Sequence, residues 1–141
     1  MHYEEVEMLF HRSKDYMSLA NVAFKEGKFD VAIFLAGQSL QLYLKATLVK
    51  YADLRLRTHS IRELLINIGK VFEMEEKVVE FIRSNRLLLR ELEDAYIDAR
   101  YEPRKYSRED AEELIEFANK VMAFVEGLVN EFERRTNRLD D

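Results

Sequence analysis

The fold is decided by residues 107–132, which read SREDAEELIEFANKVMAFVEGLVNEF. Ser107 and Asp110 stand three residues apart at its start, which resembles a capping box, in which each side chain satisfies a backbone N–H of the first helical turn. The apolar residues recur every three or four positions, the period of one face of an α-helix, and they are Ala111, Leu114, Ala118, Val121, Val125, Leu128 and Phe132. The stretch therefore predicts a long amphipathic helix that buries one face against other elements.

Four segments ahead of this helix have the same period. Each carries apolar residues three or four positions apart, and the pattern of the fourth segment is interrupted near Asn85. The predicted helices cover residues 4–26, 30–51, 60–69 and 75–101, of which the third is short.

Local signals set the ends of these helices. Gly27 follows the first helix, as a C-cap does. Ser60 and Glu63 have the spacing of a capping box at the start of the short helix. Pro103 disfavours the α conformation for the residue before it, so the fourth helix ends ahead of this proline.

Long helices with short connections favour antiparallel packing of neighbours. The sequence shows no strand-like alternation and holds only one proline and four glycines. We therefore expect an all-α fold, an up-and-down antiparallel helical bundle of four long helices plus one short helix. The bundle is expected to occupy residues 1–133, and residues 134–141 are expected to form a polar C-terminal tail.

Length and composition bound the class of protein. A chain of 141 residues fits one domain and can bury a core without disulfides or metals. The absence of cysteine excludes thiolate nucleophiles and cysteine-rich zinc sites as well as disulfides. No apolar run reaches the roughly 18–20 residues that a membrane helix needs, and the N-terminus does not resemble a signal peptide. We expect a cytoplasmic protein with no membrane partner.

The net charge of −5 argues against general coating of nucleic acid. Positive charge is nevertheless concentrated in residues 50–62 and 100–108, each with four basic residues against one acidic residue. Such segments suit contact with a phosphate or an acidic partner. Basic residues that complement helix dipoles at helix ends explain the same pattern equally well.

The motifs of most catalytic and cofactor sites are absent from the sequence. It contains neither a Gly-rich phosphate loop nor a dinucleotide fingerprint, and His2, His11 and His59 lack the spacing of metal ligands. The run Thr58-His59-Ser60 is better explained by helix capping than by catalysis. We therefore expect no metal, no cofactor and no catalytic residue, and the sequence favours a protein that is not an enzyme.

One segment combines side chains that suit a ligand. Tyr96 and Arg100 are four residues apart and share a face of the fourth helix, and Tyr101 follows at its end. Two rings and a guanidinium can stack a base and grip a phosphate. Arg104 and Lys105 follow within reach. The alternative is that Tyr96 edges the core and Arg100 caps the helix.

Two further residues are candidates for the same ligand. His59, in the turn ahead of the short helix, is expected to add a polar, basic group from another part of the fold. Lys45 shares a helix with Gln38 and Gln41, and the alternative is that these three residues only line a solvated side.

Three motifs lie between residues 32 and 101, and they read Ala32-x(3)-Ala36-x-Gln38-x(2)-Gln41-x(2)-Leu44-Lys45-Ala46, Thr58-His59-Ser60-Ile61-x(2)-Leu64-Leu65 and Tyr96-x(2)-Ala99-Arg100-Tyr101. In this order they resemble the HEPN family (higher eukaryotes and prokaryotes nucleotide-binding). The resemblance implies a bundle of four or five helices that forms a homodimer. It also implies action beside a minimal nucleotidyltransferase, in a substrate-binding or toxin–antitoxin pair, with a nucleotide or RNA as ligand.

Many HEPN proteins are metal-independent ribonucleases whose motif is an arginine, four to six residues, and a histidine. This sequence departs from that motif, because only three residues separate Arg55 from His59 and no histidine follows Arg100. Tyr96, Arg100 and Tyr101 are therefore better interpreted as binding residues. Three functions stay open: a nucleotide- or nucleic-acid-binding accessory module, a diverged ribonuclease toxin using His59 and Arg100, and a purely structural dimerisation and interaction module.

Overall fold

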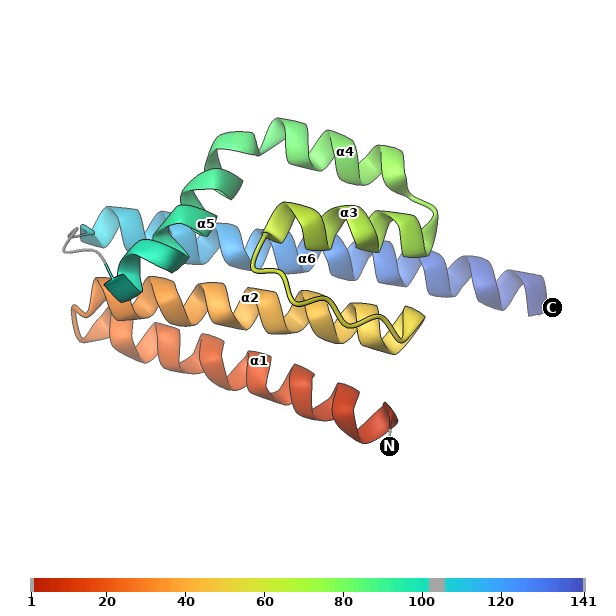
Figure 1. Ribbon diagram of the computed structural model, residues 1–141, viewed down its shortest axis with the longest axis horizontal. Helices are drawn as coiled ribbons and strands as arrows, with labels where there is room; N and C mark the ends of the chain where they lie inside the picture. Colours follow the sequence, from red (N-terminus) through yellow and green to blue (C-terminus); the bar gives the residue numbers. More distant parts are fainter. Residues whose placement is uncertain (1, 102–105, 141) are drawn as a thin grey trace.

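The computed structural model describes residues 2–101 and 106–140, with side chains described for residues 2–97 and 106–137. Every element in this part of the chain is an α-helix (Figure 1). The helices are α1 (His2–Lys25), α2 (Phe29–Ala52), α3 (Ile61–Phe72), α4 (Glu75–Ser84), α5 (Arg86–Tyr101) and α6 (Arg108–Asp140). The all-α helical bundle expected from the sequence is confirmed.

Helix α2 lies at the centre of the bundle. It packs against α1, which runs antiparallel to it, and also against α3, α5 and α6 (Figure 1). Contrary to the expectation from the sequence, α2 is by length and composition apolar enough to cross a membrane, but 61% of its most apolar window is buried inside the bundle. Ile33, Leu40 and Leu44 are fully buried. These observations make α2 the core helix of the fold.

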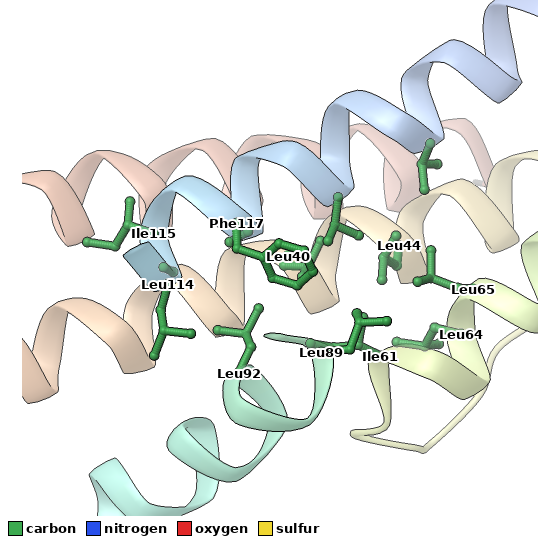
Figure 2. Packing of buried hydrophobic residues seen from close by; sticks show 14 of the residues in the cluster. Leu40, Leu44, Ile61, Leu64, Leu65, Leu89, Leu92, Leu114, Ile115 and Phe117 are labelled. Carbon is green, nitrogen blue, oxygen red and sulfur yellow. The ribbon is translucent and has the colours of Figure 1, made fainter. Parts of the chain in front are cut away.

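Side chains from α2, α3, α5 and α6 converge on one hydrophobic core, shown in Figure 2. Removal of this apolar surface from water is the main term that stabilises the fold. The core face predicted for residues 107–132 is confirmed, because the buried residues of α6 include Ala111, Leu114, Ala118, Val121, Val125 and Leu128.

The structure corrects the predicted helix over residues 75–101, which is two helices that run in different directions (Figure 1). The break lies at Asn85. Its side-chain Nδ2 donates to the carbonyl oxygen of Phe81 at 2.8 Å, and its backbone N–H donates to the same oxygen at 3.1 Å. An asparagine that bonds the preceding turn in this way competes with continuation of the helix. Helix α5 therefore crosses α2 independently of α4.

The predicted capping box at Ser107 is complete, whereas at Ser60 only the half in which the serine side chain accepts is present. Ser60 Oγ accepts the backbone N–H of Glu63 at 3.2 Å. The backbone N–H of Ser107 donates to Asp110 Oδ2 at 3.0 Å, and the backbone N–H of Asp110 donates to Ser107 Oγ at 3.1 Å. Gly27, with φ at +77°, ends α1 as predicted.

Two helices run further than the sequence analysis expected. Helix α3 continues beyond Gly69 to Phe72, and Glu73 ends it in the left-handed region with φ at 56°. Gly69 has a packing role instead, because a Cβ at this position would lie 3.0 Å from Val78 of α4. Helix α6 continues to Asp140, so it includes most of the segment expected as a polar tail.

Candidate functional site

Three of the predicted site residues lie at one corner of the bundle or on the helix face beside it. Lys45 lies on α2, Tyr96 on α5 and His59 on the segment of residues 53–60 that joins α2 to α3. The side chains of Arg100 and Tyr101, and all of Arg104 and Lys105, lie outside the described residues.

Tyr96 is part of the packing between α5 and α2. Its side chain is only 4% exposed, and its ring stacks on Phe34 with centroids 5.1 Å apart. The Tyr96 hydroxyl donates to Gln38 Oε1 at 2.6 Å. Gly37 makes this approach possible, because a Cβ there would lie 2.9 Å from Tyr96 Cδ1. Tyr96 therefore positions Gln38 and offers no open ring face of the kind that the sequence analysis expected.

Gln41 and His59 are joined by two hydrogen bonds. Gln41 Nε2 donates to the His59 carbonyl oxygen at 3.1 Å, and Gln41 Oε1 lies 3.0 Å from His59 Nδ1. Because the amide oxygen can only accept, Nδ1 carries the proton. In the neutral imidazole, Nε2 is then an unprotonated acceptor. No hydrogen-bond partner of Nε2 occurs within the described part of the chain.

The His59 ring also contacts Tyr96, with centroids 5.8 Å apart. Gln41 itself is buried, whereas His59 is exposed. The corner therefore has a buried polar anchor beneath an imidazole that solvent can reach. We call the set of Gln38, Gln41, Lys45 and His59 the glutamine–histidine corner.

Lys45 lies one helical turn after Gln41, and the spacing 38, 41, 45 places Gln38, Gln41 and Lys45 on one face of α2. Its side chain is half-buried, and this burial lowers the pKa of its ammonium group below the ordinary value because the charge loses hydration. No ion pair to Lys45 exists among the described residues. A half-buried cation without a counterion is a feature that an anionic ligand would satisfy.

The start of α3 is held to α5 by an ion pair beside the corner. Glu93 accepts from Arg62 Nη2 at 3.0 Å and from the Arg62 backbone N–H at 3.1 Å. Hydrogen bonds to Glu93 raise the pKa of Arg62 above its ordinary value. Ser60 Oγ lies 3.4 Å from the same carboxylate. These contacts fix the segment that carries His59 against α5.

Two of the four basic residues in 50–62 form ion pairs within the fold. Arg55 bonds both Glu5 of α1 and Asp53, and Arg62 bonds Glu93. These pairs raise the pKa of Arg55 and lower that of Glu5. Half of the basic residues of the segment are therefore held by the bundle.

Sequence reasoning named Gln38 and Gln41 within a motif but did not select them as site residues. Each interacts with a residue that is distant in sequence, since Gln41 bonds His59 across 18 positions and Gln38 bonds Tyr96 across 58. The available signal was the spacing 38, 41, 45 on one helix face, which collects two amides and a cation.

The fold defines the protein as a small all-α helical domain, and comparison with known proteins refines this class. The family model described as "HEPN domain" matches residues 6–128, and the chain belongs to the HEPN family. This membership makes it a nucleotide- or nucleic-acid-related module.

The solved structures include a similar one, the crystal structure of TT1696 from Thermus thermophilus. The TM-score is 0.70 and the sequence identity is 25%, and the match covers 87% of this chain and 97% of that chain. No protein in the comparison with curated proteins matches.

Proposed function

We propose that this protein is a nucleotide- or nucleic-acid-binding accessory module whose ligand occupies the glutamine–histidine corner. The observation that carries the proposal is Lys45, a half-buried ammonium group without a counterion in the described chain, one turn from the Gln41–His59 pair. A phosphate oxygen would replace the hydration that this cation has lost, and charge-assisted hydrogen bonds of this kind are strong.

Other groups of the corner suit the rest of a nucleotide. The exposed imidazole of His59 can stack on a base. The amide nitrogen of Gln38 has no hydrogen-bond partner among the described residues, so it can donate to a base edge. In this proposal Tyr96 acts by holding Gln38, and Arg100, Tyr101, Arg104 and Lys105 stay predicted contacts.

Isothermal titration calorimetry with ATP, GTP and a short single-stranded RNA tests this proposal. We expect Lys45→Ala and His59→Ala each to weaken binding of the ligand on the order of tenfold, as loss of one charged or stacking contact does. Lys70→Ala, which removes an exposed lysine of α3, is the matched control and should bind as the wild type does. Wild-type protein that binds none of these ligands would refute the proposal.

We further propose that the module is cytoplasmic and works as a homodimer beside a minimal nucleotidyltransferase, in a substrate-binding or toxin–antitoxin pair. The support is the family membership together with a single small domain that carries a ligand corner. Co-expression with a nucleotidyltransferase encoded next to this chain, followed by size-exclusion chromatography, tests the pairing. Separate elution of the two proteins would contradict it.

A second function, a diverged metal-independent ribonuclease, is favoured by one feature of His59. Its Nδ1 proton is held by Gln41, which leaves Nε2 with a lone pair that can take a proton from a ribose hydroxyl. Incubation of wild type and His59→Ala with RNA separates this function from binding alone. Cleavage that is equal in both proteins, or absent from both, removes the ribonuclease.

A further inference from the structure

The outward face of α1 carries a second stripe of side chains, distinct from the stripe that packs on α2. The buried residues of α1 are Val6, Ser13, Ala20 and Ala23. On the opposite face the residues recur at alternating intervals of four and three, the period of a coiled-coil seam, and they are Met8, Arg12, Asp15, Leu19 and Val22.

The apolar members of this stripe are unusually open. Met8 is 43%, Leu19 53% and Val22 50% exposed. Single exposed apolar residues need no explanation, but several on one helix face do. Figure 1 shows α1 at one edge of the bundle, and every residue of the stripe is exposed.

The centre of the stripe holds two opposite charges around a shallow hollow. Arg12, Asp15, Tyr16 and Leu19 line a hollow of about 270 Å³. Their positions are i, i+3, i+4 and i+7, which is the four-residue hole that receives a side chain from a facing helix in a coiled coil. A carboxylate and a phenol ring in this hole suit a guanidinium, which pairs with the first and stacks on the second.

We propose that α1 of a second copy of this chain docks antiparallel on this face, with a two-fold axis between positions 13 and 14. This inference rests on the homodimer of the proposed function and names its interface. In this register Arg12 of each copy lies opposite Asp15 of the other, and Met8 lies opposite Leu19. The positions from Met8 to Leu19 are thus complementary in charge and in apolar character, as an interface between identical faces requires, whereas Val22 lies opposite Glu5 at the end of the seam.

One flank of the seam is compatible with this register. Leu9 and Tyr16 are both half-buried and lie on the same side of the stripe. With the axis between positions 13 and 14, Leu9 of one copy is offset by about 3 Å along the axis from Tyr16 of the other, within reach of a side-chain contact. Asp15 also lies 3.6 Å from His11 Nε2, so its carboxylate sits between a histidine of its own helix and Arg12 of the second copy.

Reversal of charge tests the register by sedimentation velocity over a range of protein concentrations. Arg12→Asp places two like-charged pairs across the axis, and Asp15→Arg does the same. We expect each single variant to raise the dimer dissociation constant on the order of tenfold, and the double variant Arg12→Asp/Asp15→Arg to restore it. Lys14→Asp makes the same charge change on a neighbouring side of α1 and should leave the dimer intact.

Cysteine pairing gives a second measurement that does not depend on electrostatics, because the chain has no cysteine of its own. Position 19 of one copy lies about 16 Å along the axis from position 19 of the other, too far for a disulfide. An equimolar mixture of Met8→Cys and Leu19→Cys should therefore form a covalent heterodimer on mild oxidation, whereas each variant alone should not.

A monomeric wild type overturns the interface. So does a dimer that is indifferent to both single reversals, or one that responds to Lys14→Asp instead. Calorimetry with ATP on the same Arg12→Asp sample distinguishes this failure from failure of the ligand corner, since Lys45 and His59 lie on other elements. Circular dichroism of the variants establishes that loss of association is not loss of fold.

Discussion

Two faces of α2 carry polar side chains with different roles. On the face toward α1, Ser13 Oγ donates to the Ser39 carbonyl oxygen at 2.7 Å, and Ser39 Oγ donates to the Ser13 carbonyl oxygen at 2.7 Å. Both serines are buried, and both hydroxyl groups donate hydrogen bonds inside the protein. We call this the closed face of α2. This reciprocal pair allows the backbones of α1 and α2 to lie close together without an unsatisfied polar group.

On the face toward α5, which we call the open face of α2, the polar side chains use only part of their hydrogen-bonding and ion-pairing capacity. Gln38 accepts from Tyr96 but its amide nitrogen donates to no described residue, and Lys45 has no ion pair within the described chain. Polar contacts that use all their bonding capacity therefore hold helices together. Those with capacity left at the surface are the ones that can take a ligand.

The largest expected effect comes from Tyr96, which ties the open face to the core. Tyr96→Ala should lower the free energy of unfolding by about 3–5 kcal/mol, because a buried ring is lost and a cavity remains. Tyr96→Phe removes only the hydroxyl and should cost about 1 kcal/mol. Urea unfolding followed by circular dichroism measures both, and equal losses would mean that the hydroxyl, rather than the ring, holds α5.

The closed face is tested by a double-mutant cycle. Ser13→Ala and Ser39→Ala should each lower the free energy of unfolding by about 1 kcal/mol, since each removes one intramolecular hydrogen bond. The double variant should lose less than the sum, because the two hydroxyls contact one another at 3.2 Å and leave together. Strict additivity in urea unfolding would show that the two hydroxyls act independently.

The closed face should also respond to alkaline pH through Tyr43. Burial raises the pKa of Tyr43 from 10.0 to about 12, with a smaller contribution from Glu126. Because the folded-state pKa is the higher one, the contribution to stability is complete below pH 10 and is lost as the pH rises through about 12. Tyr43→Phe should show a shallower loss of stability over this window, and an unchanged pH profile would contradict the assignment.

The smallest effect on stability is expected at Lys45, on the open face. Its pKa is lowered by burial, so the protonated form disfavours the folded state and stability rises as the pH increases toward the ordinary value of 10.5. Lys45→Met should keep or slightly raise stability at neutral pH while it weakens nucleotide binding. A marked loss of stability in urea unfolding would assign Lys45 to the scaffold and not to the site.

Much of the fold follows from the printed sequence, and the exceptions have local causes. The core stripe of α6 and the caps at Ser60 and Ser107 were predictable because they depend on residues within one or two turns. The interruption at Asn85 was visible, but its consequence was not, since the direction of α5 depends on packing against α2. The sequence predicts a helix end at Gly69, whereas this glycine accommodates Val78 of another helix.

Only the residue types of the candidate site were predictable from the sequence. The rings and cations near His59 and Tyr96 were selected by residue type, which does not tell an open ring from a buried one. The stacking of Tyr96 on Phe34 changes its expected role from ligand contact to support of Gln38. Gln41 belongs to the site because it bonds His59, and no rule of sequence spacing connects these two residues.

The amino-acid sequence was sufficient to predict an all-α bundle and the starts of most of its helices, because helix period and capping act between near neighbours. Its three motifs carried the resemblance to the HEPN family. Which polar groups are satisfied depends instead on tertiary contacts. The approach of α5 and of residues 53–60 to α2 buries Tyr96, orients His59 and leaves Lys45 without a counterion among the described residues. Such choices depend on segments that are distant in sequence and meet only when the core forms.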